Sequence, residues 1–377
     1  MPWNDKLVSV ILLSYNNADC LPRALTSVFS QDYPHIEIII TDDGSEDFSE
    51  NEIYEYIETH KTSNIERYSI ITSPVNTGTV CNLRRALKEI HGDYYLNFGA
   101  DDTFYDSNVI SAYIHTFYLR NWDPLVITGK TGMYSKDLKH FQRGLPNRKG
   151  IEVLLEEDPK ATLNMLASSC VVVNVSSCFR KDFPELVDAY DTRYILYEDY
   201  PTFIRMARKG YTPVFINRYC VKHASGGVAN GTDNLQLSKT LFEDRNMMWK
   251  TEFDPYRNLY TQQSLAANSK RRKYEYKVYK MALLNEAAKQ KTVKGVIARG
   301  LSYLRRLTGK LAKRDQHVSK YLQIAALFSV SFFSLRINEN TFSGLLPTVI
   351  RGVFGFISIV ILILCGAILL CKHFQAK

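Results

Sequence analysis

The chain has 377 residues, of which 45% are hydrophobic and 12% aromatic, and its formal net charge at pH 7 is +8. This length accommodates one large domain or two ordinary ones, and the hydrophobic content supports a packed core, which argues against global disorder. The seven cysteines show no CxxC pair and no metal-ligand spacing, so we expect the soluble part of the protein to be cytosolic, with reduced thiols. The amino terminus has no basic stretch followed by an apolar core, so no secretory signal is expected.

Alternating strands and helices are predicted through the first hundred residues. Continuous aliphatic runs are typical of strands buried on both faces, and the apolar residues between them recur at helical spacing. This alternation predicts an α/β fold, with a mostly parallel, Rossmann-like sheet flanked by helices. We expect strands at 7–13, 36–40, 67–72 and 94–98, with helices around 21–28, 49–60 and 80–90.

The part of the chain between about 125 and 227 is less regular. Apolar runs there are short, and polar stretches separate them. We expect strands at 125–128, 170–175 and 214–216, helices at 162–169 and 201–209, and a glycine-containing loop at 219–227.

Positive charge is concentrated in residues 270–320, which contain 16 Lys and Arg and 3 acidic residues. Their net charge of +13 leaves −5 on the rest of the chain, so this segment favours an anionic surface. Residues 293–311 place apolar side chains on one helical face and basic ones elsewhere. That pattern is typical of a helix in the plane of a membrane interface, with a basic helix packed on the domain as the alternative.

An uncharged run at 353–371 would span roughly 28 Å as a helix, which predicts a single transmembrane anchor. The shorter apolar run at 321–335 favours a buried or interfacial helix. Because Lys and Arg are dense before the anchor, the amino-terminal part should lie on the cytoplasmic face of the plasma (inner) membrane. The expected organisation is a catalytic domain at 1–227, a basic helical membrane-proximal region at 228–320, an apolar helix and linker at 321–342, and the anchor at 343–371.

Polar clusters follow the predicted strands at their carboxyl ends. The carboxyl ends of parallel strands open on one edge of a sheet, where ligands bind. Each cluster alone could be an ordinary loop, but the four together indicate a nucleotide pocket. The chain has no G-x-G-x-x-G or P-loop motif, so phosphate neutralisation would need a divalent cation, which adjacent carboxylates can hold. The clusters are Ser14-Tyr15-Asn16, Asp42-Asp43, Asn76 with Gly78, and Asp101-Asp102.

Residues 7 to about 227 resemble the family 2 glycosyltransferases with the GT-A fold. The resemblance rests on the order and spacing of four segments and implies an inverting enzyme that uses a nucleotide-diphosphate sugar with Mg²⁺ or Mn²⁺. The segments are VSVILLSYNNADCLPRALTSVFSQDYPHIEIIITDDGSED, NTGTVCNLRRALKEIHGDYYLNFGADD, LYEDYPTFIRMARKGY and YCVKHASGG.

The resemblance also implies roles for the donor-side residues. Asp43 would accept a hydrogen bond from the base, and Ser14 and Tyr15 would help to hold the nucleoside. Asp101 would lie near the ribose and the metal, Asp102 would be the direct metal ligand, and His223 would help to bind metal or diphosphate. Many relatives have an additional Asp where this chain has Gly99. The other expected members of the nucleotide-sugar site are Asn16, Asp42, Asn76 and Gly78.

Glu198 and Asp199 match the catalytic pair of the family. One carboxylate must take a proton from the acceptor hydroxyl, and we assign Asp199 as this base, with Glu198 as a supporting neighbour. The alternative is an acidic first turn that favours the helix dipole. Arg84 and Arg85 could reach a phosphate, although solvated helix positions are the simpler interpretation.

We therefore expect a membrane-anchored hexosyl- or N-acetylhexosaminyltransferase for cell-surface polysaccharide synthesis. It would move a sugar from a UDP-sugar to a saccharide carried on a polyprenyl diphosphate lipid, near anionic headgroups and without a nucleic-acid partner. A processive synthase is one alternative, but the chain lacks a Q-x-x-R-W motif and has one predicted membrane span, whereas a channel would need several. An inactive membrane scaffold is the other, and the intact site carboxylates argue against it.

Overall fold

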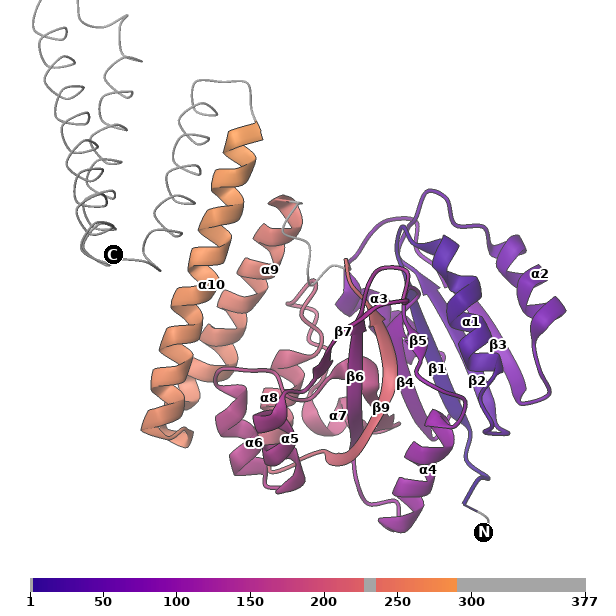
Figure 1. The fold of residues 1–377 in the computed structure, drawn as a ribbon, viewed down its shortest axis with the longest axis horizontal. Helices are drawn as coiled ribbons and strands as arrows, with labels where there is room; N and C mark the ends of the chain where they lie inside the picture. The colour runs from indigo at the N-terminus through magenta and orange to yellow at the C-terminus, as the bar shows by residue number, and fades with distance from the viewer. Residues whose placement is uncertain (1–2, 227–234, 290–377) are drawn as a thin grey trace, which may run out of the picture. The chain divides into compact units, whose positions relative to one another are not determined.

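A computed structural model of the protein describes residues 3–226 and 235–289 (Figure 1). One compact unit extends from Met1 to Tyr276, and helix α10 (Gln262–Lys289) begins in it and continues beyond it. The predicted interfacial helices and the transmembrane anchor lie outside the described residues. Among the helices that the structure describes, none is long and apolar enough to cross a membrane.

Four parallel strands form the amino-terminal half of the sheet, as the sequence predicts. Strand β1 (Val8–Ser14) pairs with β2 (Ile36–Asp42) on one side and β4 (Tyr94–Gly99) on the other, and β3 (Ile65–Thr72) pairs with β2. Ser14 lies opposite Asp42 in the register, so the polar residues that follow these two strands meet at one edge. This edge carries the candidate site.

The second half of the sheet is mixed, so the prediction of a mostly parallel sheet is correct only for the first four strands. The strand order is β3-β2-β1-β4-β8-β6-β9-β5, with β7 paired to β6. Strand β8 is antiparallel to β4 and to β6, whereas β9 is parallel to β6. These strands are β5 (Thr103–Phe104), β6 (Val126–Tyr134), β7 (Phe141–Leu145), β8 (Ser177–Arg180) and β9 (Val214–Ala224).

Two local predictions are wrong. Residues 170–175 form no strand, because Val171 and Val172 are buried against the helices and the chain then makes the short turn η2 (Asn174–Ser176) before β8. Residues 219–224 form no loop but complete β9, which pairs with β6 as far as Ala224. The polar residues of β9 come in the adjacent pairs Asn217-Arg218 and Lys222-His223, so the strand lacks the alternation that would mark it in the sequence.

Helices cover both faces of the sheet (Figure 1). One face buries Val10, Leu12 and Ile38 against α1, α2 and α4, and the other buries Ile11, Ile39 and Tyr95 against α3, α6, α7 and α8. The helix bounds are α1 (Leu21–Phe29), α2 (Glu50–His60), α3 (Thr79–Leu87), α4 (Val109–Leu119), α5 (Arg148–Leu155), α6 (Pro159–Leu166), α7 (Phe183–Val187) and α8 (Tyr200–Arg208).

Helix α9 (Leu235–Met248) and the turns η4 (Trp249–Phe253) and η5 (Asp254–Leu259) follow β9. Buried Glu252 of η4 receives hydrogen bonds from Arg205 (2.5 Å) and Arg208 (3.1 Å) of α8. The indole of Trp249 donates to Glu275 of α10 at 2.9 Å. These contacts tie η4 to the carboxyl-terminal half of α8 and to α10.

Candidate active site

The turn after β2 is organised by Asp42. Its Oδ2 accepts hydrogen bonds from the backbone N–H groups of Gly44 (3.0 Å) and Ser45 (2.8 Å), and its Oδ1 accepts from the Ser45 hydroxyl (2.7 Å). The same hydroxyl accepts from the backbone N–H of Asn16 at 2.8 Å. Asp42 and Asn16 therefore shape the two loops at this edge through contacts within the protein.

The loop after β1 leaves one aromatic ring accessible. The Ser14 hydroxyl donates to Asn17 at 3.2 Å, and Asn16 adopts a left-handed backbone with φ of +52°. Between them Tyr15 is 43% exposed. Its ring can stack on a planar base, which is compatible with the expectation that Tyr15 helps to hold the nucleoside.

Buried Asp43 joins the β2 edge to the loop before α3. Its carboxylate accepts from the backbone N–H groups of Thr77 (2.9 Å) and Gly78 (2.7 Å) and from the Thr77 hydroxyl (2.6 Å). Asn76 also accepts from the Gly78 N–H at 3.0 Å. The structure thus joins the clusters after β1, after β2 and before α3 at one edge, and the fourth follows β4, the parallel neighbour of β1, at that same edge.

The two arginines of α3 diverge. Arg85 donates to Asn82 (2.8 Å), to Thr77 (3.1 Å) and to Asp43 (3.4 Å), so it belongs to the donor side of the site. Arg84 points the other way and donates to the carbonyl oxygen of Tyr190 at 3.2 Å. Only Arg85 is placed to act at the pocket that the sequence predicts.

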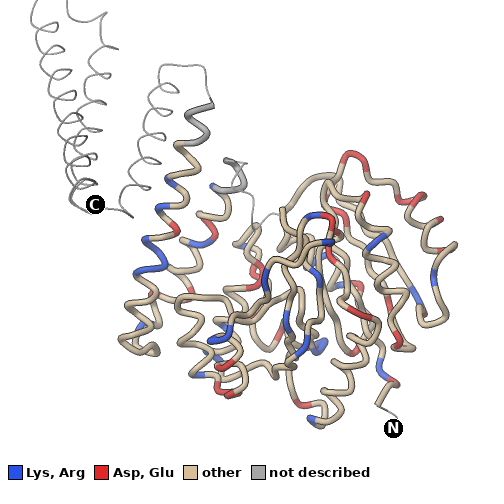
Figure 2. Tube along the Cα trace, viewed as in Figure 1, with Lys and Arg blue, Asp and Glu red and all other residues tan. Residues whose placement is uncertain are grey.

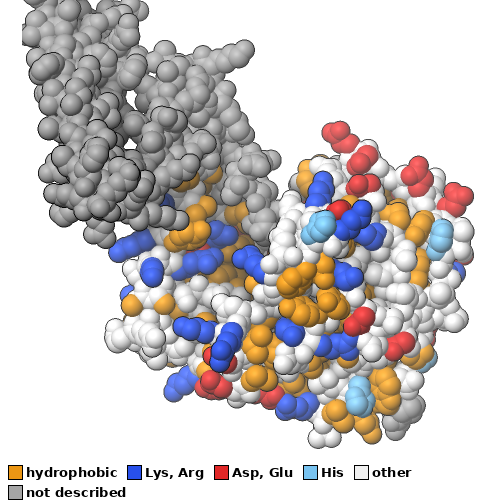
Figure 3. Space-filling view, in the orientation of Figure 1, with side chains coloured by type: hydrophobic (Ala, Val, Ile, Leu, Met, Phe, Trp, Pro, Cys, Tyr) orange, Lys and Arg blue, Asp and Glu red, His pale blue; other side chains and the backbone are white. Residues whose placement is uncertain are grey.

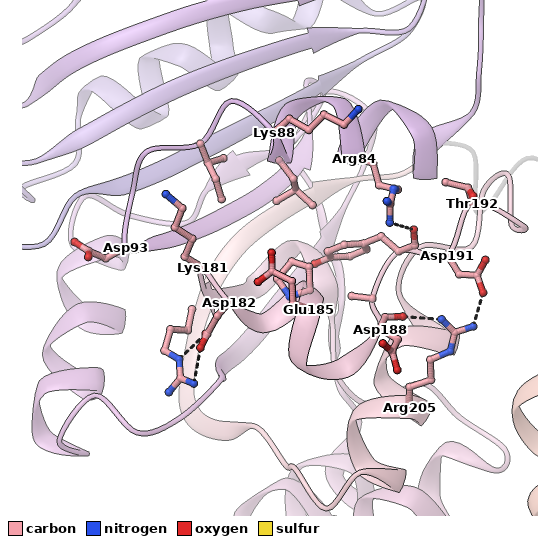
Figure 4. A pocket seen from close by; sticks show the side chains of 16 residues that line it. Arg84, Lys88, Asp93, Lys181, Asp182, Glu185, Asp188, Asp191, Thr192 and Arg205 are labelled. Atoms are coloured by element: carbon pink, nitrogen blue, oxygen red, sulfur yellow. Dashed lines mark hydrogen bonds and ion pairs between the residues drawn. The ribbon is translucent and has the colours of Figure 1, made fainter.

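Arg84 faces a cavity of about 900 Å³ whose lining includes Asp93 and Lys181, so it lies toward the amino-terminal ends of the parallel strands (Figure 4). Two ion pairs lie within its lining, Arg180 with Asp182 (2.6 Å) and Arg205 with Asp191 (2.7 Å). This cavity contains none of the predicted site residues. It is therefore separate from the strand-end site.

The carboxylates after β4 contact the end of β9. Buried Asp102 lies 2.8 Å from His223 Nδ1 through Oδ2, and its Oδ1 accepts from the backbone N–H of Ala224 at 2.9 Å. A Cβ at Gly99 would lie 2.6 Å from an Asp101 oxygen, so the glycine leaves room for that carboxylate. Burial and the charge of Asp102 raise the pKa of Asp101. Burial lowers the pKa of His223, but the charge and hydrogen bond of Asp102 raise it by more, so the net shift is upward.

The donor set of Asp101, Asp102 and His223 fits a hard divalent cation. Carboxylate oxygens are preferred by Mg²⁺ and Mn²⁺, and His223 uses Nδ1 toward Asp102, which leaves Nε2 for a ligand. Burial first, and then the charge of Asp102, raise the pKa of Asp101, and a bound cation would favour the ionised form of this carboxylate. Across residues 3–226 and 235–289, however, no three His, Cys, Asp or Glu side chains are gathered closely enough to hold an ion by themselves.

The predicted catalytic pair lies at the start of α8. Asp199 caps the helix, with Oδ1 accepting the Tyr200 N–H at 2.5 Å, and the carbonyl oxygen of Glu198 accepts from the Thr202 hydroxyl at 2.6 Å. Burial and the Asp199 charge raise the pKa of Glu198 to about 8. Burial also raises the pKa of Asp199. Raised pKa values at two adjacent carboxylates are typical of a functional site, whereas a capping role by itself favours the ionised carboxylate.

Residues 191–197, here called the bridging segment, connect this pair to the donor loop and were not predicted from sequence. A Cβ at Gly78 would lie 2.5 Å from the side chain of Ile195, and the Ile195 carbonyl oxygen accepts from the Val80 N–H at 3.2 Å. Asp244 and Arg245 of α9 also contact the segment, Arg245 through the Tyr197 hydroxyl at 2.9 Å. No motif marks these residues, because the contacts exist only after α9 packs against residues 195–197.

An aromatic surface also escaped prediction. Phe141 of β7 is 51% exposed and meets the ring of Tyr219 edge-on, and Lys130 lies 4.5 Å from the Tyr219 ring centroid. Figure 3 shows hydrophobic side chains flanked by Lys and Arg where β6, β7 and β9 lie in Figure 1. Successive side chains of a strand point to opposite faces of the sheet. Lys222 therefore lies on this aromatic surface, whereas His223 points to the other face of β9, where it contacts Asp102.

Comparison with known proteins agrees with this geometry. Residues 9–122, which contain the first four strands and the Asp101-Asp102 pair, match the family model described as glycosyl transferase family 2. The chain carries a family 2 glycosyltransferase domain. The similarity in fold extends beyond these residues. A mannosyltransferase from Pyrobaculum calidifontis, solved with GDP-Man and Mn²⁺, aligns with a TM-score of 0.50 at 17% identity. The alignment covers 81% of this chain and 80% of that one.

Curated relatives match this chain over shorter stretches. An uncharacterized glycosyltransferase of Haemophilus influenzae is 25% identical over 49% of this chain and 58% of its own length. A poly-β-1,6-N-acetyl-D-glucosamine synthase of Staphylococcus epidermidis is 31% identical over 26% of this chain and 23% of its own length. The chain therefore spans less than two thirds of either relative.

Proposed function

We propose that this glycosyltransferase moves a sugar from a UDP-sugar to a hydroxyl of a saccharide acceptor in cell-surface polysaccharide synthesis. The observation that carries the proposal is the bridging segment, whose Ile195 lies against Gly78 of the donor loop. Three residues later the chain reaches Glu198 and Asp199. Carboxylates suited to base catalysis thus follow directly on a segment that touches the strand-end edge, where the nucleotide would bind.

On the donor side, Tyr15 would stack on the base and Asp43 would accept its hydrogen bond, with Arg85 holding the Asp43 carboxylate in place. The Asp43 carboxylate is already ordered by Thr77 and Gly78, so little reorganisation would accompany binding. When bound by Asp101, Asp102 and His223, Mg²⁺ or Mn²⁺ would stabilise the negative charge of the diphosphate.

On the acceptor side, Asp199 would take the proton of the acceptor hydroxyl. The hydroxyl oxygen would bond to the anomeric carbon as the bond to the nucleoside diphosphate breaks, which inverts the configuration. The raised pKa of Asp199 makes this carboxylate a stronger base than that of an ordinary aspartate. Glu198, with a pKa of about 8, would keep its proton at pH 7 while its neighbour is ionised.

The acceptor that we propose is a saccharide on a polyprenyl diphosphate lipid at the cytoplasmic face of the inner membrane. The support is the basic segment at 270–320, whose beginning lies on α10 in the described part of the chain, where Lys270, Lys273 and Lys277 are exposed (Figure 2). Cationic side chains of this kind attract anionic headgroups. Truncation after Lys289 should release the protein from membranes and reduce transfer to lipid acceptors, and equal activity of the truncated protein on them would contradict this positioning role.

Donor binding tests the proposal. The full-length protein is heated with UDP-GlcNAc, UDP-glucose, UDP-galactose or GDP-mannose, each with and without MnCl₂. One UDP-sugar should raise the melting temperature, since a ligand at about 100 times its Kd stabilises the folded state by about 2.7 kcal/mol. The gain should require Mn²⁺ and should be lost in Asp43→Asn. If none of the four donors shifts the melting temperature of the wild type, the proposed donor class is wrong.

A further inference from the structure

The bridging segment is held at several points along its length. Asp191 accepts a hydrogen bond from Arg205 of α8 at 2.7 Å, and the Tyr194 hydroxyl lies 2.8 Å from Thr251 of η4. On its other side the Ile195 carbonyl oxygen receives the N–H of Val80, near the start of α3. The segment therefore touches the donor loop and the acceptor-side helices at once.

Asp244 of α9 fixes the middle of this segment. Its Oδ2 accepts from the backbone N–H groups of Ile195 at 3.0 Å and Leu196 at 2.7 Å. The Asp244 side chain is buried, so the loss of its acceptor would leave two backbone donors without a partner. Its neighbour Glu243 is exposed and pairs only loosely with Lys239, at 3.8 Å.

We propose that Asp244 is a positioning residue for the transfer reaction proposed above, on which this inference rests. By holding Ile195 and Leu196, Asp244 sets the position of the donor loop relative to the Glu198–Asp199 pair. The residue itself contacts backbone N–H groups and no reacting atom. Ile195 lies against Gly78 on one side and precedes Glu198 by three residues, so a displacement of Ile195 would disturb both halves of the site.

The charge of Asp244 has a second effect. Burial, Asp199 and then Asp244 act together to raise the pKa of Glu198. Asparagine at 244 keeps an acceptor oxygen for the two N–H groups but removes the charge, so the pKa of Glu198 should fall. The other titratable or charged groups around the pair are Cys170, Tyr190, Tyr197 and Arg245.

The test compares full-length wild type with Asp244→Ala, Asp244→Asn and the matched control Glu243→Gln. Release of UDP from UDP-GlcNAc, UDP-glucose and UDP-galactose is measured as a function of pH, and each variant is checked by thermal melting. Asp244→Ala should lower kcat on the order of 10²-fold, the size expected for a small misplacement of reacting groups, and should raise the donor KM. Asp244→Asn should lose less activity but shift the pH–rate limb of Glu198 to lower pH. Glu243→Gln should resemble wild type in all three measurements.

Ile195→Ala keeps the test decisive if Asp244→Ala does not fold. Ile195 is 49% exposed, so its truncation should leave the fold intact while it loosens the contact with Gly78 and raises the donor KM. An active wild type with unchanged kcat, KM and pH profile in Asp244→Asn and Ile195→Ala would overturn the positioning role and leave the proposed function standing. A wild type inactive on every donor would overturn the proposed function first, and this inference with it.

Discussion

Gly78→Ala tests the contact between the donor loop and the bridging segment. Gly78 has φ of +90° and ψ of 160°, a conformation that costs side-chain-bearing residues about 1–3 kcal/mol. An added Cβ would also lie 2.5 Å from the Ile195 side chain and 2.6 Å from its carbonyl oxygen, well inside van der Waals contact. We expect a loss of at least about 2 kcal/mol, which lowers Tm by about 3–4 °C or more for a unit that extends from Met1 to Tyr276.

Gly210→Ala is the matched control. Gly210 also has a positive φ, +89°, but an added Cβ there would meet nothing within 4 Å. Gly210→Ala should therefore lose only the stability that the strained backbone conformation costs, and it should transfer sugar as the wild type does. Gly78→Ala should lose more stability and should also raise the donor KM. Thermal melting and initial-rate kinetics on both variants measure the difference. Equal Tm losses and an unchanged donor KM in Gly78→Ala would refute the packing that links the two halves of the site.

Three further outcomes follow from the site geometry. Asp199→Asn should reduce transfer about 10²–10⁴-fold while donor affinity, measured by titration calorimetry, stays unchanged; retained turnover would remove Asp199 from the mechanism. The raised pKa of Glu198 means that its protonated form stabilises the folded state below pH 4.5 and that this contribution is lost as the pH rises through about 8. The stability of Glu198→Gln relative to the wild type, measured by thermal melting, should therefore increase as the pH rises from 4.5 to about 8. A stability difference that stays constant over this range would contradict the burial of Glu198. Arg85→Ala should weaken donor binding about tenfold through the loss of its hydrogen bond to Asp43, whereas Arg84→Ala, on the opposite edge, should bind donor as the wild type does.

The parallel half of the fold could be predicted because its signals are local. Each of the strands β1, β2 and β4 is a nearly continuous apolar run, and helical spacing marks α1 and α3 between them. The edge where β1 and β2 end follows from the parallel arrangement alone. Asp42 illustrates the limit, because composition places it at the edge but does not reveal that its oxygens are used within its own turn.

The mixed half depends on long-range pairing, which composition does not encode. β8 has four residues and is recognisable only by its antiparallel neighbours β4 and β6. Val171 and Val172 have strand-like composition but are buried among helices, so tertiary packing overrides the local preference. Asp244 is likewise an unremarkable acidic residue until α9 places it against Ile195 and Leu196.

Metal-dependent release of UDP is the most direct test of the central claim. The full-length protein is incubated with each UDP-sugar in the presence of MnCl₂ or EDTA, with and without membranes that carry the acceptor, and compared with Asp102→Asn and Asp199→Asn. The wild type should release UDP only when the metal is present, and faster when the acceptor is present. Asp102→Asn should release no UDP under any of these conditions. Asp199→Asn should still bind the donor, but the acceptor should no longer accelerate its release of UDP. UDP release that persists in EDTA, or in both variants at the wild-type rate, would contradict the assignment of this site.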